Sequence, residues 1–328
     1  QSANVDAVSG ATLTSEAVKD AAENCIAQAK GEAEPVAADD HVSPIPPAPL
    51  PEKWDYETDV VLVGASAGGL VCAARLAQNG VKTLTLEKEA EVGGTGRIAT
   101  MWDVYGGCDL YEGDTGYFGT PYRDQDVIDF YAERSGWTVD LDLLKNMTIS
   151  IREMSQWFLD NGADIVESLP GAGMWWYNFN MPEYGGCGLG AVHLLCDFNH
   201  KIALDNGAEY LMETTVTALV MDGDKCVGVQ AETSDGQVIY AKGNKGVVLS
   251  ASGFQSNPHM LAKYSGICRN IKLGLAKGTG EVIRMGQGCG ADFAGYNCAG
   301  GSTDTLPVPD YNGDMLPRCR YNEYANWI

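Results

Sequence analysis

Glycines and one acid are spaced to bind a phosphate and a sugar. Gly64, Ser66 and Gly69 lie in a turn after an apolar run, and Glu87 ends the next apolar run. A glycine-rich turn lets the backbone approach a pyrophosphate at the positive end of a helix, and a carboxylate about 20 residues further on accepts hydrogen bonds from ribose hydroxyls. The spacing predicts a site for the ADP half of a dinucleotide; the alternative is an ordinary strand–helix–strand turn with coincidental glycines. The predicted site residues are Gly64, Ala65, Ser66, Gly68, Gly69, Glu87 and Lys88.

The elements that must position this site follow from the pattern of residues 59–89. An apolar strand is followed by the turn, an amphipathic helix, and a second apolar strand that ends at Glu87. A second glycine-rich run comes next and allows another close approach of the backbone to a ligand. Its candidate binding residues are Gly93, Gly94, Thr95 and Gly96.

The rest of the chain alternates helical and strand patterns. Periodicity predicts helices over 139–161 and 191–206, and residues 169–190 predict an aromatic, glycine-rich loop. Turns with the sequences DGDK and SDGQ join three of the later strands into a β-meander. Strands are expected at 208–212, 215–221, 226–233, 237–242 and 246–251. This order of elements predicts an α/β fold with a parallel sheet and a β-meander.

The N-terminal region is expected to be separate from this fold. Within residues 4–30, a turn at Ser9–Gly10 precedes a predicted helix that Thr14 or Ser15 caps. Residues 31–53 are rich in alanine and proline and predict a partly extended linker. The main domain is therefore expected to start near Trp54.

Composition limits the classes of partner. The chain has 328 residues, 40 glycines and a formal net charge of −22. The negative charge argues against nucleic acid and anionic membrane surfaces as partners, and no apolar run is long enough to span a bilayer. Ten cysteines, none in a CxxC motif, predict free thiols rather than a zinc site. An iron–sulfur cluster built from dispersed cysteines stays an open alternative.

Five segments follow one another along the chain, namely VGASAGG, LEKEAEVGGTG, VTALVMDGDKCVGVQA, VVLSASGFQSNP and KGTGEVIRMGQGCGADF. Together and in this order they resemble one family, the FAD-dependent oxidoreductases related to the flavoprotein subunits of fumarate reductase and succinate dehydrogenase. The resemblance implies a Rossmann-type FAD-binding domain over 54–295, and residues 279–282 match the family's Thr-Gly-Asp-Gly segment in part. It adds further cofactor-binding residues, which are Val216, Ala251, Ser252 and Gly253.

The first residues carry a second resemblance. Residues 6–12, DAVSGAT, are similar to the motif of FMN-binding modules in which a flavin transferase links the FMN phosphate to the last threonine, here Thr12. The resemblance implies that residues 1–30 are the tail of such a module and that FMN is a second cofactor, covalently attached at Thr12. The alternative is a plain helix N-cap. Because such modules precede the FAD domain of extracytoplasmic reductases, the periplasm or cell surface is the expected location, with the cytoplasm as the alternative.

The catalytic residues of the family have only partial counterparts. Fumarate reductases place an arginine proton donor four residues beyond the Glu of an Arg-Phe-x-Asn-Glu segment. The nearest match here ends at Glu323, and Trp327 stands where the arginine would be. The resemblance therefore does not imply fumarate as the substrate. Arg97 is a candidate for stabilising the reduced flavin, with a plain exposed arginine as the alternative. Tyr177 and Tyr184 are candidate proton donors, with packing of a cap over the FAD domain as the alternative, and Glu323 is a further catalytic candidate.

The resemblance also implies a function. Residues 296–328 are similar to the start of the family's capping domain, so either the chain is truncated or a second polypeptide completes the site. The expected activity is reduction of an activated C=C bond in an α,β-unsaturated acid or enone by hydride transfer from FAD. Electrons would arrive through FMN from a redox donor protein or a quinol-linked carrier, in anaerobic respiration. The alternatives are a dehydrogenase that desaturates a ketosteroid-like ring, and an electron-transfer subunit without small-molecule chemistry.

Overall fold

The structure is a computed structural model, and it forms two compact units, residues 1–43 and residues 44–328. The residues it describes are 19, 22–23, 26–27, 29–31, 40–98, 102–103, 124–167, 176–181, 186–187, 192–251, 253–265, 278–292, 308–309 and 315–316. In the first unit, the described residues from Lys19 to Lys30 are helical, as predicted. Thr14 and Ser15, the predicted caps of that helix, lie outside the described residues.

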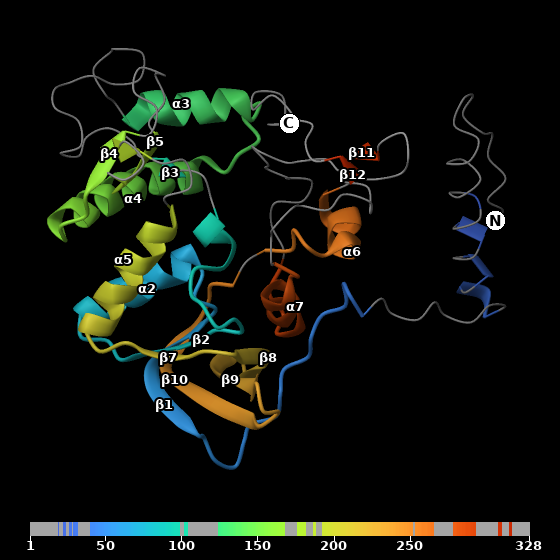
Figure 1. Ribbon diagram of the computed structural model, residues 1–328. Coiled ribbons are helices and arrows are strands. Elements are labelled where there is room, and N and C mark those ends of the chain that lie inside the picture. Colours follow the sequence, from blue (N-terminus) through green and yellow to red (C-terminus); the bar gives the residue numbers. More distant parts are fainter. Residues whose placement is uncertain are drawn as a thin grey trace. The chain divides into compact units, whose positions relative to one another are not determined.

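The second unit combines one large sheet, a small sheet and several helices (Figure 1). Its strands are β1 (Tyr56–Val63), β2 (Thr83–Leu86), β3 (Trp102–Asp103), β4 (Ile165–Glu167), β5 (Trp176–Met181), β6 (Gly186–Cys187), β7 (Glu209–Leu211), β8 (Thr214–Asp222), β9 (Lys225–Thr233), β10 (Val238–Leu249), β11 (Val308–Pro309) and β12 (Met315–Leu316). Its helices are α2 (Ala67–Gln78), α3 (Asp124–Arg134), α4 (Leu141–Asp160), α5 (Val192–Asp205), α6 (Pro258–Met260) and α7 (Glu281–Gly288), with the 3-10 helix η1 (Gly94–Ile98) and the π-helical turn η4 (Leu261–Ser265). Within the described residues, no helix combines the length and the apolar character that crossing a membrane requires.

The large sheet has six strands in the order β7-β2-β1-β10-β9-β8. The neighbouring strands β7, β2, β1 and β10 run parallel to one another. The strands β10, β9 and β8 form an antiparallel meander. The predicted α/β fold with a parallel sheet and a β-meander is therefore confirmed. The carboxyl ends of β1 and β2 meet at one edge of the sheet, which is where open α/β sheets bind ligands.

One strand joins the two halves of the sheet. The sequence predicted separate strands at 237–242 and 246–251, but β10 runs through both without a break. The residues between them form an irregularity in the pairing with β1 instead of a turn: Gly243 pairs with Thr58, and Gly246 pairs with Val60. A Cβ on Gly243 would lie only 2.2 Å from the Gly246 carbonyl oxygen, so glycine is needed at this close approach.

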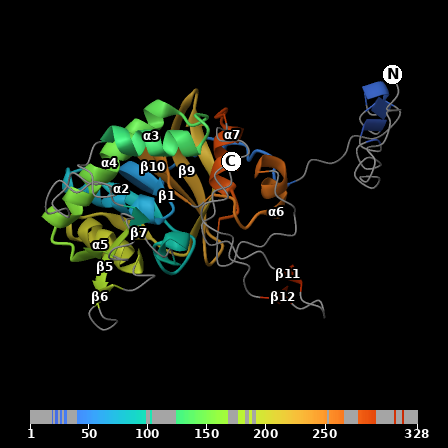
Figure 2. The ribbon, with the colours of Figure 1, turned by 90° about the horizontal axis from the view of Figure 1, so that it is seen from above.

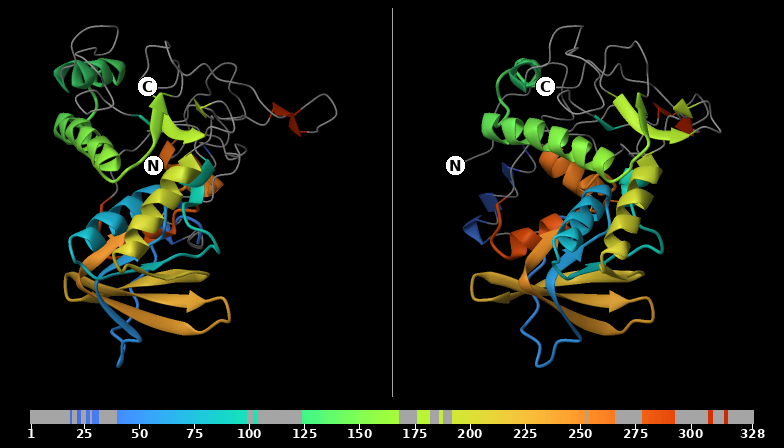
Figure 3. Two further views of the ribbon diagram at one scale, coloured as in Figure 1. Left: turned by 60° about the vertical axis from the view of Figure 1, so that its left-hand side comes forward. Right: turned by 90° about the vertical axis from the view of Figure 1, so that its left-hand side faces the viewer.

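Both faces of the parallel strands are covered, because side chains alternate along β1. Val60 and Leu62 pack on the face that α2 and α5 cover. Val61 and Val63 pack on the opposite face, in a cluster that includes Val282 of α7 and residues of the meander. Figure 3 shows α2 and α5 side by side over the sheet, and Figure 2 shows α6 and α7 on the other side of it.

A second region, made of α3, α4 and a small sheet, packs against α2 and α5. The small sheet has the strand order β3-β5-β4, and β6 pairs with β5. Its strands β5 and β6 lie within residues 169–190, so the prediction of a loop there was wrong for part of the segment. Helix α4 confirms the predicted helix at 139–161, and the Trp157 Nε1–H ties it to α2 by donating to Gln78 Oε1 at 2.9 Å. Helices α3 and α7 were not predicted from the sequence.

Candidate functional site

The turn between β1 and α2 is fixed by close backbone contacts. Gly64 has φ +90°, a left-handed conformation that favours glycine, and its N–H donates to the Leu86 carbonyl at 2.8 Å. A Cβ on Gly64 would lie 2.8 Å from the Ala251 Cα, and a Cβ on Gly69 would lie 2.6 Å from the Gly64 carbonyl oxygen. Both glycines are therefore required for this turn to pack against the end of β10.

The N-terminus of α2 is open to a ligand on one side. Ser66 is the N-cap residue, and its Oγ accepts the Gly69 N–H at 3.3 Å. Gly68 is exposed, and the nearest atom to a Cβ built on it would be the Ser66 Oγ at 4.0 Å. No acidic residue stands in the first turn of α2. The positive end of the helix dipole is thus accessible and meets no carboxylate of its own turn, which suits a pyrophosphate.

Glu87 is a buried carboxylate at the end of β2, with 6% of its surface exposed. Its Oε2 accepts the Ala65 N–H at 2.7 Å, and its Oε1 accepts the Glu89 N–H at 2.9 Å. No lysine or arginine of the described residues forms an ion pair with it. Because each carboxylate oxygen has a second lone pair, Glu87 can still accept hydrogen bonds from the hydroxyls of a sugar.

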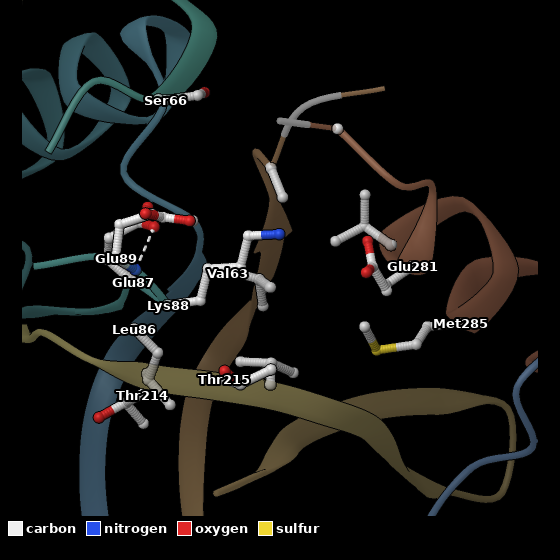
Figure 4. A pocket seen from close by; sticks show the side chains of 16 residues that line it. Val63, Ser66, Leu86, Glu87, Lys88, Glu89, Thr214, Thr215, Glu281 and Met285 are labelled. Carbon is white, nitrogen blue, oxygen red and sulfur yellow. Dashed lines mark hydrogen bonds between the residues drawn. The ribbon is translucent and has the colours of Figure 1, made fainter. Parts of the chain in front are cut away.

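A cleft opens between this turn and α7 (Figure 4). Glu87 and Glu89 lie on one side of it, and Glu281 and Met285 lie on the opposite side. Thr215 of β8 lies at the bottom of the view. The residues that line it are Val63, Gly64, Ser66, Leu86, Glu87, Lys88, Glu89, Gly94, Thr214, Thr215, Val216, Ala251, Gly278, Glu281, Val282 and Met285.

The first turn of α7 is docked by contacts to residues 253–260. Gly280 has φ +85°, and its N–H donates to the Gly253 carbonyl at 3.1 Å. A Cβ on Gly280 would lie 2.2 Å from the Met260 Sδ, so a larger residue would collide with the buried Met260. The Asn257 side chain donates to the Thr279 carbonyl at 3.0 Å, and the Thr279 hydroxyl donates to Glu281. These contacts place Glu281 at the cleft.

The structure brings part of the predicted set of site residues to the cleft. The predicted residues that line it are Gly64, Ser66, Glu87, Lys88, Gly94, Val216 and Ala251. Others belong to the supporting turns around it and do not line it, namely Ala65, Gly68, Gly69, Gly93, Thr95, Gly96 and Gly253. Thr12, Ser252, Tyr184 and Glu323 lie outside the described residues, and only the backbone of Tyr177, in β5, is described.

Arg97 is engaged away from the cleft, in an ion pair with α5. Its Nη1 lies 2.7 Å from Asp197 Oδ1 and its Nη2 lies 3.4 Å from Asp197 Oδ2. The hydrogen bond to Asp197 raises the pKa of Arg97 above its usual value. Next to Asp197, burial raises the pKa of the Cys196 thiol to about 11. A Cβ on Gly93 would lie 3.0 Å from the Cys196 Sγ, so α5 supports the second glycine-rich turn from behind.

Some residues that line the cleft were missed by the sequence analysis. For Glu281 a signal existed, because residues 279–282 match the Thr-Gly-Asp-Gly segment of the family in part. Thr214 and Thr215 begin β8, and no local pattern marks them as ligand-facing. Met285 follows Glu281 by about one helical turn on α7, so the two side chains share a face of that helix. Because α7 was not predicted, Met285 was not recognised as a cleft residue.

Two segments that together make up most of the chain match known protein families. Residues 59–295 match the FAD binding domain family, and residues 1–27 match the FMN-binding domain family. The chain is 24% identical to the NADH:acrylate oxidoreductase of Vibrio harveyi over 96% of this chain and 36% of that protein. It is 25% identical to the NADH:fumarate oxidoreductase of Klebsiella pneumoniae over 87% of this chain and 29% of that protein. This chain therefore spans only about a third of the length of these two relatives.

Solved structures show the same fold. A 3-ketosteroid-Δ4-(5α)-dehydrogenase from Rhodococcus jostii RHA1 matches 74% of this chain and 55% of its own chain, with a TM-score of 0.63 at 21% sequence identity. The open conformation of a flavocytochrome c3 fumarate reductase matches 73% of this chain and 41% of its own, with a TM-score of 0.59 at 22% identity. The chain belongs to the family of FAD-binding domains found in the flavoproteins of fumarate reductase and succinate dehydrogenase.

Proposed function

We propose that this chain binds FAD in the cleft and is part of a reductase of an activated C=C bond in an α,β-unsaturated acid or enone. The observation that carries the proposal is the buried Glu87 carboxylate, held by two backbone N–H groups at the edge of a cleft beside the open N-terminus of α2. The family match over 59–295 supports FAD as the ligand. Relatives named for the reduction of acrylate and fumarate support the type of reaction.

The residues of the cleft suit the parts of FAD. The N-terminus of α2 with Ser66 would hold the pyrophosphate, and Glu87 would accept the ribose hydroxyls. Val282 and Met285 are almost fully buried and would exclude water from one wall of the cleft. When bound, FAD supplies hydride transfer, which no amino-acid side chain provides.

The route of the electrons is a further part of the proposal. The match of residues 1–27 to the FMN-binding domain supports FMN as the group that passes electrons to FAD, with covalent attachment at Thr12. The resemblance of this module to those of extracytoplasmic reductases supports a location outside the cytoplasm and a role in anaerobic respiration. Acid precipitation followed by peptide mass analysis tests the attachment. A phosphoester-linked FMN on the Thr12 peptide is expected, and a Thr12→Ala variant should lack it.

The test of the main function has two stages. The purified chain should first release FAD on acid denaturation. The flavin, reduced with a viologen under anaerobic conditions, should then be reoxidised by one or more members of a panel of acrylate, fumarate, vinyl phenols and steroid enones. The Gly64→Ala variant is the control, because it is expected to lose the cofactor while its surface stays the same.

Each failure has a separate meaning. A folded chain without any flavin would contradict FAD binding and with it the whole proposal. Bound FAD that no alkene reoxidises, but that a protein acceptor does reoxidise, would make the chain an electron-transfer subunit. Reduction of an artificial electron acceptor, with electrons that a saturated ketosteroid passes to it through the flavin, would reverse the proposed direction of the reaction.

A further inference from the structure

A proline-rich segment that precedes β1 packs against the rest of the second unit. Residues 44–49, with the sequence PIPPAP, are here called the strap. Because proline has no backbone N–H, only Ile45 and Ala48 of the strap can donate one. Both donate to the domain: Ile45 to the Arg284 carbonyl of α7 at 2.9 Å, and Ala48 to the Leu219 carbonyl of β8 at 2.8 Å.

Because of the strap, the folded domain starts earlier in the chain than Trp54, the start that the sequence suggested. Residues 31–53 were predicted to be a linker, yet the compact unit already begins at Pro44. The predicted extended backbone suits this docking, because prolines restrict φ before the strap binds and so reduce the entropy lost on ordering it. The strap also lies between the two segments that match known families, residues 1–27 and 59–295.

One end of the strap covers the edge of the large sheet. β8 is one of the two edge strands of this sheet, and Ala48 forms a parallel bridge with Val220 of β8. An uncovered edge strand offers unpaired N–H and C=O groups to other chains. The prolines of the strap cannot extend the ladder outward, so the edge ends there.

The other end of the strap runs beside α7 (Figure 1). Ile45 is half-buried and packs against the core cluster that contains Val282 and Met285 of α7. A Cβ on Gly288 would lie 1.8 Å from the Ile45 carbonyl oxygen. The strap can therefore lie directly on the helix only because residue 288 has no side chain.

We propose that the strap is a positioning element of the cofactor site. It joins β8 to α7, and both of these elements line the cleft, β8 with Thr215 and α7 with Glu281 and Met285. Displacing the strap releases α7 at its C-terminal turn, so the α7 wall of the cleft shifts and FAD binds more weakly. The inference rests on the proposed binding of FAD in this cleft.

Two glycines of α7 provide a matched pair of variants. Gly288→Ala drives a methyl group into the backbone of the strap. Gly286→Ala makes only ordinary van der Waals contacts, with the Ala291 Cβ at 3.7 Å and the Leu249 Cδ1 at 4.0 Å. Both changes add the same helix propensity. We expect Gly288→Ala to raise the Kd for FAD by about tenfold, which corresponds to about 1.4 kcal/mol, because the overpacked methyl group displaces the strap. Gly286→Ala should leave the Kd within about twofold of the unchanged chain, since a shift of that size is under 0.5 kcal/mol.

A second pair of variants acts on the strap and leaves α7 untouched. Ala48→Pro removes the N–H that bonds to Leu219, and Pro47→Ala keeps both donors of the strap. Because the variant loses one of the two hydrogen bonds that hold the strap, we expect Ala48→Pro to raise the Kd for FAD by about two- to tenfold. Pro47→Ala should raise it less than Ala48→Pro does.

The measurement is titration of the full-length apoprotein with FAD, followed by flavin fluorescence, with the visible circular dichroism of the bound flavin as a second readout. Far-ultraviolet circular dichroism at the same temperature shows which variants are folded. If the unchanged chain does not bind FAD, the proposed function fails. If it binds FAD, and each folded strap variant binds as tightly as its control, the role of the strap is overturned while FAD binding stands. If Gly288→Ala does not fold, the comparison of Ala48→Pro with Pro47→Ala decides whether the strap affects FAD binding.

Discussion

The two walls of the cleft are built in opposite ways. One wall comes from the contiguous residues 59–89, where β1, the glycine turn, α2 and β2 follow each other and end at Glu87. The other wall is assembled from β8 and α7, which lie far apart in the sequence, and the strap holds the two together. The first wall depends on local backbone geometry, whereas the second depends on several long-range contacts being made together. Among the residues that line the cleft, we therefore expect single substitutions to affect FAD binding more strongly in the first wall.

Gly64→Ala should have the largest effect. The substitution forces a left-handed conformation on alanine, which costs about 1–2 kcal/mol, and crowds Ala251, which costs about 1–3 kcal/mol more. FAD binding should be lost, and urea unfolding should show the drop in stability. Gly80→Ala is the control, because Gly80 also has positive φ (+73°) but open space around it. Equal losses in the two variants would show that the contact with Ala251 does not matter.

Glu87→Gln should have the next largest effect. The amide replaces a charged acceptor of two backbone N–H groups, and hydrogen bonds to a charged group are worth about 1.5–3 kcal/mol. FAD affinity should fall by about tenfold or more, measured by flavin titration. Glu57→Gln is the control, since Glu57 is exposed and only pairs with Lys242 at 3.8 Å. Unchanged FAD affinity in Glu87→Gln would remove Glu87 from the site.

Val282→Ala tests the α7 wall with a smaller change. Val282 is buried, so losing its two methyl groups should cost about 1–2 kcal/mol of stability. FAD affinity should fall by about threefold, because the wall keeps its backbone position. Val238→Ala, at a side chain that is 49% exposed, is the matched control for the same truncation. A loss of affinity in Val282→Ala as large as in Glu87→Gln would contradict the difference between the walls.

Arg97→Ala should have the smallest effect. The Arg97–Asp197 pair is partly exposed, and such pairs contribute about 0.2–1 kcal/mol. Thermal unfolding should register this small loss, which should shrink as salt is added. Lys201→Ala, which breaks the exposed pair with Asp205 on the same helix, is the control. A large change in the redox potential of the bound flavin in Arg97→Ala alone would instead place Arg97 at the flavin, as the sequence first suggested.

Local sequence patterns were sufficient to predict the first wall. The predicted strand, turn, helix and second strand are β1, the Gly64 turn, α2 and β2, and Glu87 does end β2. Each of these features depends on neighbours in the chain: the positive φ of Gly64, the cap by Ser66, and the apolar periodicity of the strands. The prediction of FAD came from the resemblance to a family, because the turn alone is shared by many dinucleotide-binding proteins.

Other elements could not be predicted from local patterns. The strand β5 lies in a stretch rich in glycine and aromatic residues that reads as a loop, and its strand form comes from pairing with β3, β4 and β6. The glycines 243 and 246 suggested a break in β10, but pairing with β1 carries the strand through them. In both cases hydrogen bonds to partner strands outweighed the local preference for a turn.

The sequence by itself determined the α/β fold class, the glycine turn and the position of Glu87, since these depend on backbone geometry over a few neighbouring residues. Only the tertiary structure decided that Glu281 and Met285 face Glu87 across a cleft, that Arg97 turns to Asp197, and that the strap belongs to the folded domain. The physical reason is that these contacts join segments far apart in the chain. Hydrogen bonds and packing that form only when the whole domain is assembled set their geometry, and no local pattern encodes it.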